Sequence, residues 1–288
     1  MQNLDKLATL VNALPESYQA ARDLVTKMST VIEGIGDRPI EWRPENCRVV
    51  QGTSDRSKLP KGAGIGSIVI GETLVEQPFA VIPIRCWSNR QYWNPDPDKT
   101  NMICNSPDAV VGFRYGKCRS CEFANFNKET NKPQCNKVWT MLCTDTNLAH
   151  VFLVQFAKSN YSNGNDWFTT MKTVGVASYK RCYNLSAATS TKSKNVELLN
   201  VAPSTVKPDE VILPVLEELF HISGLDRTEQ LVKFYDYIKN KPSDDTPLLE
   251  TAQNLQHLLT SEIENADVEE ASVISETPAA AKGKKYAL

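Results

Sequence analysis

The cysteines are the residues of this sequence whose spacing predicts chemistry most directly. Four of them, Cys104, Cys118, Cys121 and Cys135, read C-x13-C-x2-C-x13-C. Zn²⁺ prefers four soft thiolates in a tetrahedron, and a C-x2-C pair supplies two of them from one tight turn. The surrounding segment is rich in turn residues and poor in large aliphatic side chains, so burial alone would fold it poorly. We therefore predict one structural zinc ion per chain, held in a loop over residues 104–137.

The other four cysteines leave alternatives open for this site. Cys86 or Cys143 could replace one of the outer ligands, whereas Cys47 and Cys182 are expected to act as small buried hydrophobes. A further alternative is that all the cysteines are reduced thiols that bind no metal. Zn²⁺ with four thiolates carries a formal charge of about −2, which nearby cations could offset. These cations are Arg114, Lys117, Arg119, Lys128, Lys132 and Lys137.

Side chains that could perform catalysis are sparse. A full thiolate shell leaves no coordination position for water, and the three histidines stand outside any H-E-x-x-H motif. The glycine-rich segment 62–67 lacks both the Lys-Ser/Thr ending of a P-loop and the third glycine of a Rossmann motif. We interpret it as a turn before a strand that could touch phosphates through Lys58 and Lys61. We do not expect an enzyme; a Mg²⁺-dependent nuclease using aspartates of region 96–108 is the catalytic alternative.

Positive charge and aromatic rings are concentrated in the middle of the chain. The net charge is −2, but residues 41–200 carry a surplus of +7, while residues 201–288 carry −8. Seventeen of the 23 aromatic residues, including all five Trp, lie in the same middle region. Cations interleaved with rings can neutralise phosphates while stacking on bases. The alternative is that these rings simply fill the core of a β domain.

Two stretches combine rings and cations most densely. Residues 85–93 lead from a predicted strand toward the cysteine loop, and residues 112–119 cross the C-x2-C pair. Strand alternation would place Arg85 and Trp87 on one face and Cys86 on the other. Later cations and rings could extend the groove along neighbouring strands. The residues predicted to contact nucleic acid are Arg85, Trp87, Arg90, Tyr92, Trp93, Phe113, Arg114, Tyr115, Lys117, Arg119, Lys158, Tyr161, Trp167, Lys172, Lys180 and Arg181.

The periodicity of apolar residues divides the chain into four parts. Residues 1–40 are predicted to be helical, residues 41–200 to form a barrel or sandwich of short strands, and residues 201–261 to be helical again. Residues 262–288 are predicted to be a disordered acidic tail. Trp139, Phe152 and Phe156 are expected in the β core. The predicted strands cover residues 48–51, 67–70, 79–87, 137–144, 150–157, 167–178 and 180–185.

These motifs resemble those of bacteriophage single-stranded-DNA-binding proteins. The resemblance is carried by residues 79–87 with Tyr92-Trp93, and by the sequence around the four cysteines, over about residues 41–185. It implies an α+β fold: an OB-like β-barrel with an inserted four-cysteine zinc loop, flanked here by N- and C-terminal helices. It also implies sequence-independent binding of single-stranded DNA in phage replication or recombination. Zinc is then assigned to Cys104, Cys118, Cys121 and Cys135.

The resemblance also suggests partners and a location. Such proteins often end in an acidic tail that recruits replication or recombination proteins, although here the chain finishes with the basic residues 282–288. The flanking helices are candidates for self-association along the strand. The sequence has neither a signal peptide nor an apolar run long enough to span a bilayer, so we expect a cytoplasmic protein in the host cell, with no membrane partner. The alternative function is a zinc-stapled replication or transcription accessory factor acting mainly through protein–protein contacts.

Overall fold

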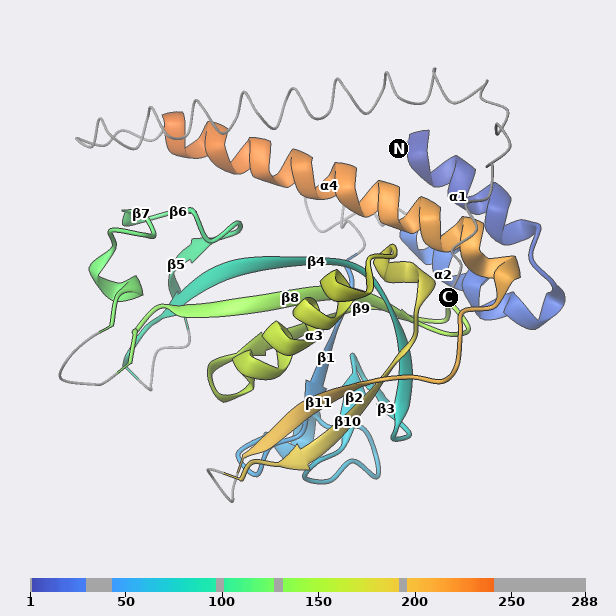
Figure 1. Cartoon of the computed structure of the whole chain (residues 1–288), viewed down its shortest axis with the longest axis horizontal. Helices are drawn as coiled ribbons and strands as arrows, with labels where there is room; N and C mark the ends of the chain where they lie inside the picture. Colours follow the sequence, from blue (N-terminus) through green and yellow to red (C-terminus); the bar gives the residue numbers. More distant parts are fainter. Residues whose placement is uncertain (1, 30–42, 97–100, 127–131, 192–195, 241–288) are drawn as a thin grey trace, which may run out of the picture. The chain divides into compact units, whose positions relative to one another are not determined.

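The computed structural model describes residues 2–29, 43–96, 101–126, 132–191 and 196–240, and these form an α+β protein with a curled sheet (Figure 1). The contacts divide the chain into two compact units, residues 1–226 and 227–288. The first unit holds the sheet, and we describe it by itself. The helices are α1 (Gln2–Asn12), α2 (Gln19–Ser29), α3 (Tyr161–Val174) and α4 (Leu213–Asn240), and α4 begins in the first unit.

One sheet of nine strands organises the described part of the first unit. Its order is β11-β10-β4-β8-β9-β1-β2-β3, and β5 pairs with the end of β4 on the edge opposite β8. The pair of β1 and β9 is parallel, and the other pairs are antiparallel. The strands are β1 (Glu45–Val49), β2 (Ile68–Ile70), β3 (Thr73–Val75), β4 (Phe79–Trp93), β5 (Met102–Ser106), β8 (Asn136–Asp145), β9 (Val151–Ala157), β10 (Tyr183–Thr189) and β11 (Glu197–Pro203). A separate hairpin contains β6 (Val111–Gly112) and β7 (Gly116–Lys117).

Strand β4 connects the body of the sheet to the cysteine segment. It is 15 residues long, and it pairs with β10 at its start, with β8 along most of its length and with β5 at its end. The β4–β8 ladder shifts register between Pro83 and Arg85. Strands β5, β6 and β7 therefore lie at the far end of this ladder, away from the main core. We call residues 90–93, 101–126 and 132–137 the arm.

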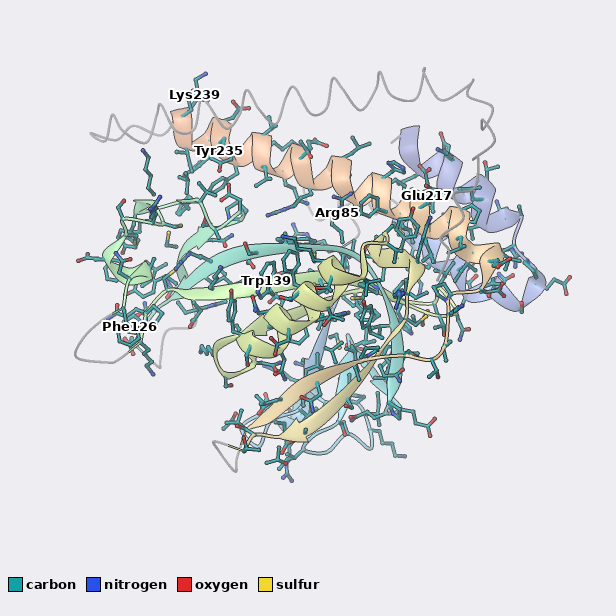
Figure 2. All side chains as sticks on the ribbon, in the orientation of Figure 1. Arg85, Phe126, Trp139, Glu217, Tyr235 and Lys239 are labelled. Carbon is teal, nitrogen blue, oxygen red and sulfur yellow. The ribbon has the colours of Figure 1, made fainter. Side chains whose placement is uncertain are left out.

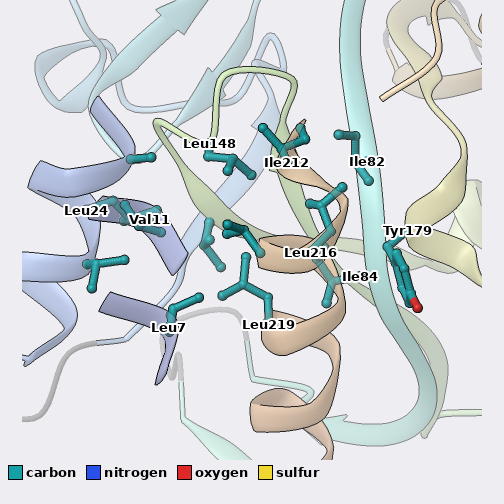
Figure 3. Close-up of a cluster of buried hydrophobic side chains, with 14 of the residues drawn as sticks. Leu7, Val11, Leu24, Ile82, Ile84, Leu148, Tyr179, Ile212, Leu216 and Leu219 are labelled. Carbon is teal, nitrogen blue, oxygen red and sulfur yellow. The ribbon is translucent and has the colours of Figure 1, made fainter. Parts of the chain in front are cut away.

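Both faces of the central strands are buried, because apolar side chains alternate to either side. Val81, Met141 and Phe152 point into a core that also contains Trp167 of α3. Their neighbours in sequence, including Ile82, point into a second core with α1, α2 and the first turns of α4 (Figure 3). The sheet is thus fixed between α3 on one face and the α1, α2 and α4 residues on the other.

The predicted strand over residues 167–178 is wrong, because residues 161–174 form helix α3. Trp167 and Met171 are four residues apart on its buried face, and Gly175 ends the helix with φ of 68°. The threonines that suggested a strand bond their hydroxyls to carbonyls one turn earlier, at 2.8–2.9 Å, as helical threonines can. These are Thr169, Thr170 and Thr173.

Close packing of α3 on β9 allows a prediction for Gly164. A Cβ atom at this position would lie 2.5 Å from the Cβ of Phe156, whose side chain is fully buried. We expect Gly164→Ala to lower the free energy of unfolding by about 1–3 kcal/mol, because the helix must move away from the sheet. Urea unfolding measures this change. Gly64→Ala is the matched control, because no atom lies within 4 Å of its added Cβ; an equal loss in both variants would contradict the prediction.

The boundary predicted between the β domain and the C-terminal helical region falls inside a strand. Strand β11 crosses the predicted boundary between residues 200 and 201, so the sheet continues into the region predicted to be helical. The predicted tail 262–288 lies outside the described residues, as do parts of the predicted segments 1–40, 104–137 and 201–261.

Among the described helices, none combines the length and the apolar character needed to cross a membrane. The 3-10 turns are η1 (Glu16–Tyr18), η2 (Arg56–Lys58), η3 (Glu122–Ala124), η4 (Lys158–Asn160), η5 (Ser178–Lys180) and η6 (Glu210–Ile212).

Candidate metal centre and nucleic-acid interface

The four cysteines of the C-x13-C-x2-C-x13-C pattern line one small cavity in the arm. Cys104 lies on β5, Cys118 follows β7, Cys121 precedes η3 and Cys135 immediately precedes β8. The cavity has a volume of about 10 Å³, which is close to the space that a single water molecule requires. Four chain segments up to 31 residues apart in sequence therefore converge on a space of ionic size.

The backbone next to the thiols is shaped to let them approach. A Cβ on Gly112 would lie 2.9 Å from the Sγ of Cys104 and 3.8 Å from the Sγ of Cys118, so only glycine leaves room for both thiols. Gly116 turns the hairpin with φ of 75°, a conformation that favours glycine. The backbone N–H of Arg114 donates to the Sγ of Cys104 over 3.4 Å. A thiol that accepts a backbone hydrogen bond is better able to carry negative charge.

Electrostatics at the cavity depend on Arg90, which is one of its lining residues. Burial raises the pKa of the Cys135 thiol to about 11, and it also raises the pKa of Cys118. The Arg90 guanidinium acts in the opposite direction on both thiols, and it donates to the carbonyl of Ala124 over 3.3 Å. Burial of Cys118 and Cys135 therefore favours their neutral thiols, whereas Arg90 favours the ionised form that a metal ion binds.

The donors fit a four-thiolate zinc site in number and type, since Zn²⁺ accepts four cysteine sulfurs. Within the described residues, however, no group of three or more His, Cys, Asp or Glu side chains has an arrangement that could hold a metal ion. The convergence of the four cysteines is thus a structural finding, while bound zinc stays a prediction. The alternative ligand Cys143 is fully buried in the main core next to Phe152, and it does not line this cavity.

The arm has a small aromatic core beside the cavity. Tyr92 stacks on Phe123 with ring centroids 4.7 Å apart. The centroid of the Tyr115 ring also lies 4.7 Å from that of Phe123, and the two ring planes are tilted by 48°. The Tyr92 hydroxyl donates to Oε1 of Gln134 over 3.2 Å, and only 6% of the residue is exposed. Tyr92, predicted to contact nucleic acid, is therefore part of what holds the arm together.

Other rings and cations of the arm face solvent. Trp93, Phe113 and Tyr115 are 42%, 39% and 38% exposed. Phe126, which the sequence analysis did not single out, is 63% exposed and lies at the end of the arm (Figure 2); its place in the cation-rich segment after the C-x2-C pair was the available signal. The predicted contacts Arg114, Lys117 and Arg119 are exposed on the same segment.

A second group of rings lies where β8 meets α3. Trp139 of β8 stacks on Phe168 of α3 with centroids 4.4 Å apart. The Nζ of Lys137 lies 6.0 Å from the Trp139 ring and 5.8 Å from the ring of Tyr161. We call Lys137, Trp139, Tyr161 and Phe168 the α3 strip. Trp139 was expected to be a core residue, and this is partly so. Its side chain packs against the main core, but it is only half-buried and its ring also stacks on Phe168.

The register of the sheet connects the arm to the α3 strip. Arg90 on β4 pairs directly with Lys137 on β8, so their side chains leave the same face of the sheet. Arg90 is at the cysteine cavity, and Lys137 is at the rings of the strip. Lys158 and Lys172, two further predicted contacts, are exposed just before α3 and on α3. The Arg90–Lys137 pair therefore links the cysteine cavity to the half-buried rings of the α3 strip.

Trp167 is a correction to the predicted contacts. It is 2% exposed and packs edge-on against Phe156 and Tyr183 in the main core. The helical spacing of α3 buries Trp167 in this core and leaves its neighbour Phe168 half-buried at the edge of the core, stacked on Trp139. A ring so placed cannot stack on a base while the domain is folded.

Arg85 and Trp87 lie on the opposite face from Arg90, with Cys86 turned the other way, as strand alternation predicted. The Arg85 guanidinium donates to the carbonyl of Phe220 over 2.7 Å and to the Ser223 hydroxyl over 3.3 Å. It also lies 4.1 Å from the centroid of the Phe220 ring, and burial lowers its pKa. Arg85 thus holds α4 on the sheet (Figure 2), and Trp87 packs against the same core. The last predicted contacts, Lys180 and Arg181, are exposed after α3.

These contacts of Arg85 predict a mainly structural effect of substitution. We expect Arg85→Gln to lower the free energy of unfolding by about 2 kcal/mol, because a charged hydrogen bond and a cation–π contact are lost at a half-buried position. Urea unfolding provides the measurement, with Arg181→Gln as the control because Arg181 is exposed. Equal stability of Arg85→Gln and the parent would show that the contacts with α4 contribute nothing.

Comparison of the chain with protein-family models, with curated proteins and with solved structures finds no match. The arm, the cysteine cavity and the α3 strip are therefore the features of this chain that bear on its function.

Proposed function

We propose that this protein binds single-stranded DNA without sequence preference, through the arm and the α3 strip. The observation that carries the proposal is the arm itself, on which exposed rings and cations surround a cavity lined by four cysteines. Its resemblance to phage single-stranded-DNA-binding proteins supports a role in phage replication or recombination, in the cytoplasm of the host cell. In this proposal the protein is not an enzyme.

Zinc is proposed as the structural element of the arm. Bound among Cys104, Cys118, Cys121 and Cys135, it would join four segments whose described apolar core is small. That core contains the Tyr92, Tyr115 and Phe123 rings with Ile103 and Ala124. An OB-like barrel is proposed for the body for two reasons. The sheet is curled, and the parallel pair of β1 and β9 connects the β1, β2 and β3 strands to the rest of the sheet. The rings and cations would then lie on an arm that continues from both strands at one end of the β4–β8 ladder.

The chemistry of the exposed side chains favours single strands over a duplex. A ring that stacks on an unpaired base contributes about 1–3 kcal/mol, and every base offers such a face whatever the sequence. Rings cannot reach bases that are stacked inside a duplex without a cost of unstacking. Arg114, Lys117 and Arg119 would neutralise phosphates, so the affinity should fall steeply with added salt.

Titration with a fluorescent oligonucleotide tests the proposal. An unstructured oligonucleotide, its duplex of equal length and the matching RNA would be titrated with the full-length protein over a salt series. We expect tighter binding to the single strand than to the duplex, with little dependence on base sequence. Equal affinity for single strand and duplex, or no binding to either, would reject the function. In the second case the alternative of an accessory factor that acts through protein contacts would take its place.

A further inference from the structure

A second cavity lies outside the arm and the α3 strip, in the segment that links β1 to β2. Its volume is about 380 Å³, which falls in the range of about 300–1,000 Å³ that is typical of small-molecule sites. The glycine-rich turn that the sequence analysis set aside forms one wall. The lining residues are Val50, Gln51, Ser54, Arg56, Leu59, Pro60, Lys61, Gly62, Ala63, Gly64 and Ile65.

The charged groups around this cavity are one-sided. Arg56 and Lys61 both line it, and neither has an acidic partner among the described residues. The nearby acids are engaged elsewhere: Asp55 accepts from the backbone N–H of Ser57 at 3.1 Å and pairs with Lys58 at 3.6 Å. No acidic residue is among the lining residues, all of which the structure describes. The cavity therefore favours an anion.

Glu197 is the other acid close to the segment. Its Oε2 would be 3.8 Å from a Cβ on Gly66, and its Oε1 accepts from the Thr189 hydroxyl over 3.0 Å. Gly66 does not line the cavity, so this carboxylate lies beyond its edge. Arg56 and Lys61 therefore line the cavity, and no carboxylate lines it.

The segment is held in shape by its own hydrogen bonds. Gln51 donates from Nε2 to the carbonyl of Glu197 over 2.8 Å, and Gly64 donates to the Ser67 hydroxyl over 3.0 Å. The backbone N–H of Gly66 donates to the carbonyl of Val50 over 2.9 Å. Gly62 and Gly66 have φ of 87° and 82°, conformations that glycine adopts readily. The cavity is therefore a built feature of the connection between β1 and β2.

Apolar side chains form the remaining wall of the cavity. Val50, Leu59, Pro60 and Ile65 line it beside the two cations, and Ile65 is 60% exposed. An aliphatic surface next to paired cations suits a ligand with a flat apolar part joined to a phosphate. A nucleotide has this composition, with its base against the aliphatic wall and its phosphate at Arg56 and Lys61.

We infer that the cavity between β1 and β2 binds a nucleoside phosphate, through Arg56 and Lys61 at the phosphate and the aliphatic wall at the base. The ligand comes either free in solution or as one nucleotide of a DNA strand. The inference stands apart from the proposed function, because no lining residue belongs to the arm or to the α3 strip.

Amide resonances of Gly62, Gly64 and Ile65 in the full-length protein report ligands in this cavity. The probes are dAMP, deoxyadenosine, inorganic phosphate and a short oligothymidylate. We expect saturable shifts with dAMP, and much smaller shifts with deoxyadenosine or phosphate at the same concentration. If only the oligonucleotide shifts these resonances, the ligand is a nucleotide within a strand. No shift with either dAMP or the oligonucleotide, or equal shifts with phosphate alone, would overturn the inference.

Variants separate a specific site from general attraction by positive charge. Arg56→Gln and Lys61→Gln should each weaken binding by about tenfold, because each removes a charge-assisted contact with the phosphate. Lys58→Gln is the matched control, because it removes the same charge from a lysine that pairs with Asp55 and does not line the cavity. Equal weakening in all three would overturn the site. Gly64→Leu fills the cavity at a position with open space, and it should abolish binding.

One comparison separates this inference from the proposed function. Substitution of Cys118 and Cys121 should remove binding of a strand to the arm and leave the dAMP shifts at Gly62 and Gly64 unchanged. Loss of oligonucleotide binding in that variant, with dAMP binding intact, supports the cavity independently. Loss of the dAMP shifts in the same folded variant would show that the cavity is not a separate site.

Discussion

Replacing Cys118 and Cys121 together with serine is expected to abolish zinc binding and to weaken binding of single-stranded DNA by at least about tenfold. The two thiols are half of the proposed ligand set, and serine does not supply the soft thiolates that Zn²⁺ prefers. Without the ion, the described part of the arm retains a small core of the Tyr92, Tyr115 and Phe123 rings with Ile103 and Ala124, and we expect its exposed cations to lose their fixed positions. Zinc content per chain and a titration with a fluorescent oligonucleotide measure both effects.

The control for this variant removes the thiol of Cys86, which lies on β4 away from the cysteine cavity. Cys86 is half-buried on β4, packs against the main core and does not line the cysteine cavity. Cys86→Ala should therefore keep both the zinc and the DNA affinity of the parent. Retained DNA affinity in the zinc-free double variant would separate the metal from the function. Less than one zinc per chain in the parent, with all four cysteines readily alkylated, would remove the metal site.

The cysteine spacing predicted that Cys104, Cys118, Cys121 and Cys135 would come together, and all four line one cavity, while zinc binding stays a prediction. The sequence also predicted the sides of β4: Arg85 and Trp87 share a face, and Cys86 has the other, as alternation requires. What alternation could not reveal is the element that covers each face. The first turns of α4 are more than 120 residues away in sequence, and their contact with Arg85 depends on tertiary packing.

The residues near α3 show a different limit of sequence patterns. Threonine and valine are common in strands, so residues 167–178 suggested one, yet burial of Trp167 and Met171 at helical spacing decided for a helix. That choice reverses the roles of adjacent rings. Trp167 becomes a core residue, while Phe168 is half-buried and stacks on Trp139, a residue that its apolar strand context had assigned to the core. The α3 strip therefore could not be predicted before the helix was known.

The largest effect on salt dependence is expected from Arg114, Lys117 and Arg119, three of the exposed cations of the arm. In Arg114→Gln/Lys117→Gln/Arg119→Gln, the slope of log K against log salt concentration should become shallower by about 2, because each phosphate contact on a single strand contributes about 0.7. At low salt the affinity should fall by at least about a hundredfold. The zinc content should be unchanged, because none of the three substituted residues is one of the four cysteines proposed to bind zinc. Oligonucleotide titrations over a salt series give both the slope and the affinity.

A charge-matched control decides whether the arm or the net charge of the protein is responsible. Lys27 on α2, Arg43 before β1 and Lys207 before η6 are also exposed, and all lie outside the arm and the α3 strip. Replacing these three with glutamine changes the net charge equally, so general attraction would predict the same loss. Binding through the arm predicts a nearly unchanged slope for this control. Equal slopes in the two triple variants would mean that the strand does not follow the arm, and the proposed interface would have to be abandoned.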